Sequence, residues 1–168
     1  MAVRAHVEAT PRRGSIRGLM ARAPRGAHTV AAILDGMSEH GWLALHDVET
    51  PHGTIDHVVV GPAGVFVIST NAGRGRVSVE TIDERTYVEP YALARRVEAL
   101  IGHKVTPVLV YSQAKLSRDV SRQRGVMVVM AKTLAGHLDR RRDRLARAEV
   151  DSLYHQLVGM SWAAAPAG

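Results

Sequence analysis

The sequence of 168 residues contains no cysteine, few aromatic residues (4%) and no long apolar run. Without cysteine the chain forms no disulfide, no zinc–thiolate site and no thiol nucleophile. A membrane-spanning helix needs about 18 consecutive apolar residues, and no segment approaches that length. The first residues also lack the apolar core of a signal peptide, so we expect a cytoplasmic protein without a membrane segment.

Hydrophobic residues make up 46% of the chain and charged residues 23%, which suits one folded core but not two. We expect a single domain over residues 26–158, a flexible basic arm over residues 1–25 and a disordered tail over residues 159–168. The arm contains proline and glycine and shows no sustained apolar period. Few lysines beside abundant arginine, alanine and glycine are typical of proteins from GC-rich bacterial genomes.

The formal net charge of +6 is concentrated at the two ends of the chain, whereas residues 26–139 are nearly neutral. A basic arm is attracted to DNA or RNA by charge alone. A solvated arm without a partner fits the same pattern. Aromatic residues are too few for a platform that stacks the bases of single-stranded nucleic acid. The candidate nucleic-acid contacts are therefore the arginines of the arm: Arg12, Arg13, Arg17, Arg22 and Arg25.

Hydrophobic periodicity predicts an α/β fold in which a mixed sheet is flanked by helices on both sides. A glycine-led edge strand is expected near residues 73–79, after three short strands that form an antiparallel meander. The predicted helices cover residues 27–39, 91–101, 133–138 and 148–157. The other predicted strands cover residues 42–48, 55–60, 65–68, 105–111 and 126–130. The expected order is α-β-β-β-β-α-β-β-α-α.

Five side chains that can bind metals lie within 12 residues: His46, Asp47, His52, Asp56 and His57. Neighbouring residues of a regular strand point to opposite faces of the sheet, so Asp56 and His57 cannot reach the same ion. The same argument separates His46 from Asp47, and we do not expect one histidine-rich metal site. Asp56 alone shares a strand face with valines, where a carboxylate needs a partner or a cation unless it faces solvent at the start of the strand.

Residues 53–68 read GTIDHVVVGPAGVFVI, a string that resembles the signature of the nuclease-related domain (NERD) family. The similarity extends over about residues 26–158. This resemblance implies a restriction-endonuclease-like fold and a Mg²⁺-dependent phosphodiesterase site. In the family this site uses the aspartate of the Ile-Asp-His string, a Glu-or-Asp-x-Lys at the end of the next strand and a glutamate of the first helix. Carboxylates hold the hard Mg²⁺ ion, and the lysine positions the attacking water and offsets developing charge.

The sequence departs from this family pattern at most of the functional positions. Asp56 is a remnant of the catalytic set, but Ser69 and Asn71 occupy the positions of the acid and the lysine. Ala27 occupies the position of the helix glutamate, and Tyr91 follows Pro90 where the family has glutamine. A single carboxylate should bind Mg²⁺ poorly. We therefore expect a NERD-like domain with a degenerate active site, non-catalytic or impaired, without a cofactor and with a nucleic-acid-binding role.

Two alternatives remain open from the sequence. The first is an active nuclease with a rearranged site, in which Asp56 binds Mg²⁺ as the metal ligand and Arg74 or Arg76 replaces the lysine. The second is a protein–protein interaction module with an unidentified protein partner and no nucleic-acid role. The acids that could join a rearranged site are Asp47, Glu49 and Glu80, although none has the spacing of the family motif.

Overall fold

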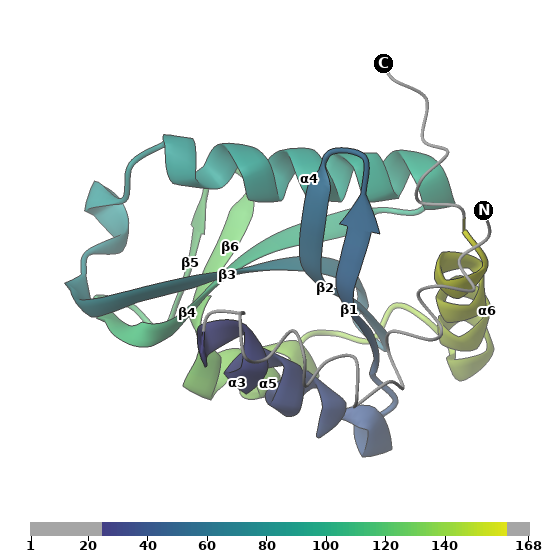
Figure 1. Cartoon of the computed structure of the whole chain (residues 1–168). Helices are drawn as coiled ribbons and strands as arrows, with labels where there is room; N and C mark the ends of the chain where they lie inside the picture. The colour runs from purple at the N-terminus through teal and green to yellow at the C-terminus, as the bar shows by residue number, and fades with distance from the viewer. Residues whose placement is uncertain (1–24, 161–168) are drawn as a thin grey trace.

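The computed structural model describes residues 25–160, which fold into one six-stranded sheet with helices on both faces (Figure 1). The strands are β1 (Leu43–Thr50), β2 (Gly53–Gly61), β3 (Gly64–Val77), β4 (Val105–Leu116), β5 (Val120–Gln123) and β6 (Val126–Met130). The helices are α3 (Arg25–Asp35), α4 (Arg85–Ile101), α5 (Ala131–Asp139) and α6 (Arg147–Gly159), with short 3₁₀ turns at Ser38–His40 and Val79–Thr81. None of these helices is long and apolar enough to cross a membrane.

The spatial order of the strands is β1-β2-β3-β4-β6-β5. Strands β1, β2 and β3 form an antiparallel meander, β3, β4 and β6 are parallel, and β5 pairs antiparallel with β6. The parallel pair β3–β4 requires a crossover, which α4 provides over one face of the sheet (Figure 1). This mixed sheet flanked by helices confirms the predicted fold class.

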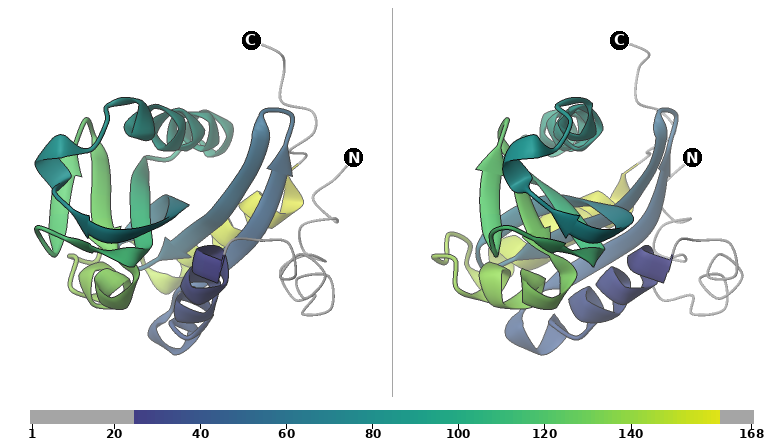
Figure 2. Two further views of the ribbon diagram at one scale, coloured as in Figure 1. Left: turned by 60° about the vertical axis from the view of Figure 1, so that its left-hand side comes forward. Right: turned by 90° about the vertical axis from the view of Figure 1, so that its left-hand side faces the viewer.

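Helices cover both faces of the sheet (Figure 2). An apolar layer fills the space between the sheet and the helices on each side. The α4 and α6 side is packed by alternate residues of the meander, such as Val58 and Val60, against helix residues spaced by four, such as Leu93 and Val97. The opposite side packs β2 and β3 against α3 and α5, with Phe66 fully buried. A β-carbon on Gly61 would lie 2.1 Å from the Trp42 ring, so only glycine permits this close approach.

The predicted separate edge strand at residues 73–79 is wrong, because β3 is one strand of 14 residues in the interior of the sheet. Its pairing with β4 shifts register between Asn71 and Arg74, so the glycine-rich stretch produces an irregularity rather than the end of a strand. Pairing continues because β4 extends to Leu116, beyond its predicted end.

Strand β5 was not predicted, since its sequence VSRQ is short and largely polar. It forms the edge of the sheet through its antiparallel pairing with β6. The observed order of helices and strands is therefore α-β-β-β-α-β-β-β-α-α. Before the central helix there is one strand fewer than predicted, because residues 73–77 belong to β3, and after it there is one more, β5.

The helix boundaries also differ from prediction. Helix α4 begins at Arg85 rather than 91, because Pro90 lies inside the helix and does not start it. Proline removes one helical hydrogen bond, but Tyr87 and Pro90 are both buried, and this packing stabilises the first turns. Helix α3 ends at Asp35, and the remainder of the predicted helix is a 3₁₀ turn.

Candidate functional site

Asp56 lies in β2 at an interruption of its pairing with β1. His46 pairs with His57 and Val48 pairs with Ile55, but no pair forms between Asp47 and Asp56. Asp47 has a φ of 51°, in the left-handed region that is uncommon for residues other than glycine, although aspartate adopts it more often than most. The regular alternation assumed from the sequence is thus broken where the two acids face each other.

The β2–β3 pairing places Asp56 beside the segment 69–71, as the sequence predicted. His57 pairs with Ile68, so Asp56 comes next to Ser69, and the Thr70 amide donates a hydrogen bond of 2.8 Å to Asp56 Oδ2. Strand alternation puts Ser69 and Asn71 on the face of Val67, which packs toward α4. Asp56, Ser69 and Asn71 therefore lie close together on the α4 side of the sheet.

The environment of Asp56 disfavours the ionised form of its carboxyl group. Partial burial raises its pKa above the usual 3.8, the hydrogen bond from the Thr70 amide lowers it, and the charges of Asp47 and Glu89 raise it again. Glu89 belongs to α4, so Asp56 faces the helix that covers this side of the sheet. A carboxylate held at such a cost is typical of a functional position.

Asn71 cannot replace the function of a lysine, since its side chain is used within the chain. Asn71 Oδ1 accepts a hydrogen bond of 2.8 Å from the Gly73 amide, which closes an Asx-type turn at the irregularity of β3. The Asn71 carbonyl accepts a hydrogen bond from Ser112 Oγ. Asn71 therefore shapes the strand, and Arg74, the expected alternative to the lysine, donates from Nε to Gln113.

Helix α3 carries Ala27 near its start, and an alanine side chain supplies no metal ligand. The polar contact of α3 with the sheet comes instead from Asp35 at its other end, 2.7 Å from His46 Nε2. His46 Nδ1 in turn lies 2.8 Å from His57 Nδ1, and both histidines are buried. The sequence analysis missed this chain, because its recognition requires the pairing of His46 with His57.

The hydrogen-bond network assigns the protons of the histidine pair when both rings are neutral. The Asp35 carboxylate only accepts, so His46 carries its proton on Nε2 and its Nδ1 accepts from His57 Nδ1–H. His57 Nε2 is then a buried lone pair without a hydrogen-bond partner among the described residues. Burial, with a smaller effect from His46, holds the pKa of His57 well below 6.5.

The fold places the five residues that can bind metals in separate contacts instead of bringing them together at one site. His46 and His57 contact each other, Asp56 binds the Thr70 amide, and His52 is exposed in the β1–β2 turn. Within residues 25–160 no group of three or more histidine, aspartate or glutamate side chains is arranged to hold a metal ion.

The residues around Asp56 do not fit the Mg²⁺ site that the family implies. Mg²⁺ is bound by oxygen ligands with near-octahedral geometry and favours carboxylates. Here one Asp56 oxygen already accepts from Thr70, the Asn71 amide oxygen accepts from Gly73, and Ser69 offers only a neutral hydroxyl. Of the motif positions only Asp56 supplies a carboxylate, and although Asp47 and Glu89 lie near it, these acids form no group with Asp56 that could hold a metal ion within the described residues.

The predicted nucleic-acid contacts of the arm cannot be placed. Arg12, Arg13, Arg17 and Arg22 lie outside the described residues, and Arg25 is the first residue of α3. Most of the predicted tail also lies outside them. Their part in binding stays a prediction.

The fold defines an α/β domain with a mixed sheet, in which Asp56 lies beside Ser69 under helix α4. The profile of the nuclease-related domain (NERD) matches residues 23–113, more than half of the sequence. The chain belongs to this family, as its resemblance to the family signature indicated.

Comparison with solved structures gives a crystal structure of a repair endonuclease from Pyrococcus abyssi, with 13% sequence identity and a TM-score of 0.40. The match covers 74% of this chain and 47% of the other, so the chain spans about half the length of that endonuclease chain. A likeness of this size says nothing about the substrate of the chain. None of the curated proteins matches the sequence.

Proposed function

We propose that this NERD-family domain binds nucleic acid but has lost efficient phosphodiester cleavage. The observation that carries the proposal is the contrast at Asp56: strand pairing puts Asp56 beside Ser69, but Ser69 and Asn71 occupy the positions that the family resemblance assigns to the acid and the lysine. A metal ion and a lysine each contribute several kcal/mol of transition-state stabilisation. Losing both should slow cleavage by several orders of magnitude, at about 1.4 kcal/mol per tenfold.

The hydrogen bonds of the site support degeneracy rather than a simple exchange of ligands. The Asn71 amide oxygen accepts a hydrogen bond from the Gly73 amide, and Asp56 Oδ2 accepts one from the Thr70 amide. Both contacts stabilise the protein without any ion. These internal hydrogen bonds can therefore hold the site in its conformation without a bound cation.

The nucleic-acid part of the proposal rests on the basic ends of the chain and on the family. Residues 1–25 contain six arginines and one glutamate. Contacts between arginine and phosphate release counterions, so log K should fall linearly with log[salt], with a slope of about −0.9 per phosphate contacted on duplex DNA. Binding of a labelled duplex by the full chain at several salt concentrations measures this slope. Replacement of Arg12, Arg13, Arg17, Arg22 and Arg25 by serine should make it shallower, and an unchanged slope would exclude the arm as the contact.

The catalytic part is tested by incubating the full chain with plasmid and single-stranded DNA in Mg²⁺ or Mn²⁺. We expect no cleavage above that of the Asp56→Ala variant. Cleavage by the wild type that disappears in Asp56→Ala would overturn the proposal of a degenerate site. Absence of any binding to DNA or RNA would favour the alternative of a protein–protein interaction module.

A second candidate function is an active nuclease with a rearranged site, favoured by one observation. The charges of Asp47 and Glu89 act on Asp56, so other carboxylates lie near the remnant aspartate. If these acids form a new metal site, Asp47→Asn and Glu89→Gln should each abolish cleavage by the wild type. Under the degenerate-site proposal there is no cleavage for them to remove.

A further inference from the structure

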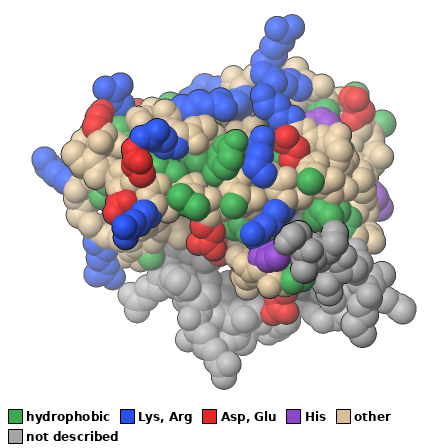
Figure 3. Space-filling view, turned by 90° about the horizontal axis from the view of Figure 1, so that it is seen from above, with side chains coloured by type: hydrophobic (Ala, Val, Ile, Leu, Met, Phe, Trp, Pro, Cys, Tyr) green, Lys and Arg blue, Asp and Glu red, His purple; other side chains and the backbone are tan. Residues whose placement is uncertain are grey.

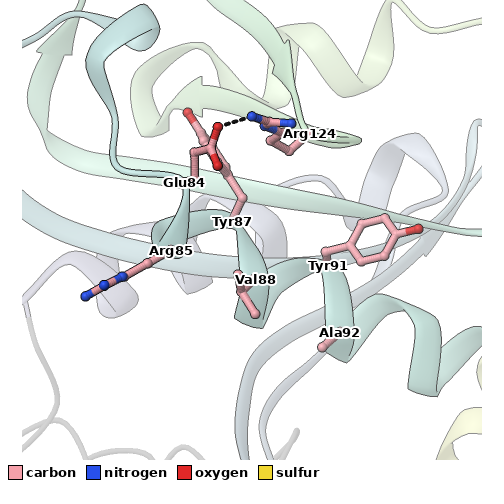
Figure 4. Close-up of a pocket in the computed structure, with 7 residues that line it drawn as sticks. All are labelled: Glu84, Arg85, Tyr87, Val88, Tyr91, Ala92 and Arg124. Carbon is pink, nitrogen blue, oxygen red and sulfur yellow. Dashed lines mark hydrogen bonds and ion pairs between the residues drawn. The ribbon is translucent and has the colours of Figure 1, made fainter.

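An apolar groove of about 500 Å³ lies between the first turns of α4 and the turn that joins β5 to β6. Its walls include Tyr87, Val88, Tyr91 and Ala92 of α4, and Arg124 of the turn (Figure 4). Val88 and Tyr91 are 66% and 44% exposed, the two largest exposures among the large hydrophobic residues of the described chain. Seen from above α4, hydrophobic side chains occupy the middle of this face and arginine or lysine side chains border them (Figure 3).

The Tyr91 ring is held in place although it is exposed. The Arg95 guanidinium lies over the ring, 5.3 Å from its centroid. Arg95 is itself fixed, because it donates to the Val105 carbonyl of β4 and to Glu98. A β-carbon at Gly125 would lie 3.2 Å from Tyr91 Cε2, so the β5–β6 turn also packs closely against Tyr91. A fixed aromatic ring costs little conformational entropy when a ligand stacks on it.

The charges around the groove favour an anionic partner. Arg124 forms an ion pair with Glu84, as Figure 4 shows, but Arg85 and Arg96 form no ion pair or side-chain hydrogen bond with the described residues. Arg85, Val88, Ala92 and Arg96 follow one another along the same side of α4, since their spacing approximates whole helical turns. The two unpaired arginines therefore lie at opposite ends of this row, which by the same spacing also includes the exposed Glu89.

We propose that this groove binds single-stranded nucleic acid, with one base against Tyr91 and phosphates near Arg85 and Arg96. The ligand needs an apolar planar face and negative charge at regular intervals, and a single strand offers both. At 1.5 Å per residue, Arg85 and Arg96 are about 16 Å apart along the helix axis. At about 3.4 Å per stacked base this spans roughly four or five nucleotides. In a duplex the bases are stacked on one another and cannot enter such a groove.

The inference rests on the proposed nucleic-acid binding, but it concerns a surface separate from the arm and from Asp56. The test measures binding of a short labelled oligothymidylate and of an abasic oligonucleotide of the same length to the full chain. Tyr91→Ala should weaken binding of oligothymidylate about tenfold, the loss expected for one stacked base. Tyr91→Phe keeps the ring and should bind like the wild type, and the abasic probe should not distinguish the three proteins.

A matched control is Val120→Ala, since Val120 is 40% exposed on the edge strand β5 and does not line the groove. It should leave oligothymidylate binding unchanged. Serine at the five arm arginines should weaken all probes while the ratio between wild type and Tyr91→Ala stays the same. Unfolding temperatures of all variants check that the fold is intact.

Three results would overturn the inference. If Tyr91→Ala binds oligothymidylate as tightly as the wild type, the groove does not bind the bases, although nucleic-acid binding itself stands. If the wild type binds neither probe, the proposed function fails together with this inference. If the wild type is a dimer that Val88→Asp dissociates while oligothymidylate binding is unchanged, the groove is a contact between two copies of the chain.

Discussion

Asp47 and Asp56 oppose each other across β1 and β2 at the position where the ladder between these strands is interrupted. Six residues around them pair regularly on either side: His46 with His57, Val48 with Ile55 and Glu49 with Thr54. Like charges opposite each other in a sheet are destabilising, and here the charge of Asp47 raises the pKa of the partly buried Asp56. Local geometry, burial and charge therefore all disfavour the ionised form of Asp56.

Asp56→Asn should stabilise the protein at neutral pH. Because the folded state raises the Asp56 pKa above 3.8, the ionised form costs stability above the folded pKa, and this cost disappears as the pH falls to the unfolded value. Asparagine removes the charge and keeps an oxygen that accepts from the Thr70 amide. If the cost is about 1 kcal/mol, Tm rises by about 2–4 °C.

Thermal unfolding between pH 4 and pH 8 measures this gain, which should shrink toward the acidic end of that range. The matched control is Asp119→Asn, since Asp119 is an exposed aspartate between β4 and β5. A variant Asp56→Asn that is less stable than the wild type at neutral pH would show that the hydrogen bond from the Thr70 amide compensates the charge of Asp56.

His57→Asn should remove part of the loss of stability in mild acid. Burial keeps the folded pKa of His57 well below 6.5, so below that pH the unfolded chain binds a proton that the folded chain does not. The wild type therefore loses up to about 1.4 kcal/mol of unfolding free energy per pH unit below 6.5 from this group. The variant is less stable at pH 8, because the contact with His46 changes, but its stability should fall less steeply with acid.

Urea unfolding at a series of pH values gives the slope for this comparison. His52→Gln serves as the control, since His52 lies exposed in the β1–β2 turn. An identical slope for the wild type and His57→Asn would mean that His57 takes up its proton in the folded state.

The sequence predicted the β2–β3 hairpin and the approach of Asp56 to residues 69–71, because both follow from local strand alternation and a tight turn. It did not predict the continuity of β3, since Gly73 and Gly75 are typical of turns and only the pairing with β4 shows that the strand continues. The contact between His46 and His57 likewise depends on the register of β1 against β2. The exposed face of Tyr91 was missed for a different reason: a low count of aromatic residues says nothing about which of them are fixed at the surface.

Gly61→Ala should destabilise the domain strongly, although it adds a single methyl group. The added β-carbon would lie 2.1 Å from the Trp42 ring, so the indole or the strand must move. Overpacking of this kind costs about 1–3 kcal/mol, and the Trp42 Nε1 hydrogen bond to Asp139 resists movement of the ring. Tryptophan fluorescence during urea unfolding measures the loss. Gly159→Ala is the control, since nothing lies within 4 Å of its added β-carbon, and a loss as large in this variant would exclude the contact with Trp42 as the cause.

The degenerate-site proposal predicts that activity can be introduced by substitution. Ala27→Glu, Ser69→Asp and Asn71→Lys together place carboxylates and a lysine at the positions that the family resemblance assigns to them. Because strand pairing already puts Ser69 and Asn71 beside Asp56, the triple variant should cleave DNA in the presence of Mg²⁺. Asn71→Lys also removes the hydrogen bond to the Gly73 amide, so the variant should be less stable by about 1 kcal/mol.

Plasmid nicking measures the activity, and Asp56→Ala in the same background should abolish it. A wild type that nicks plasmid as fast as the triple variant would show that the missing acid and lysine are dispensable, and the loss of function inferred at Ser69 and Asn71 would be wrong.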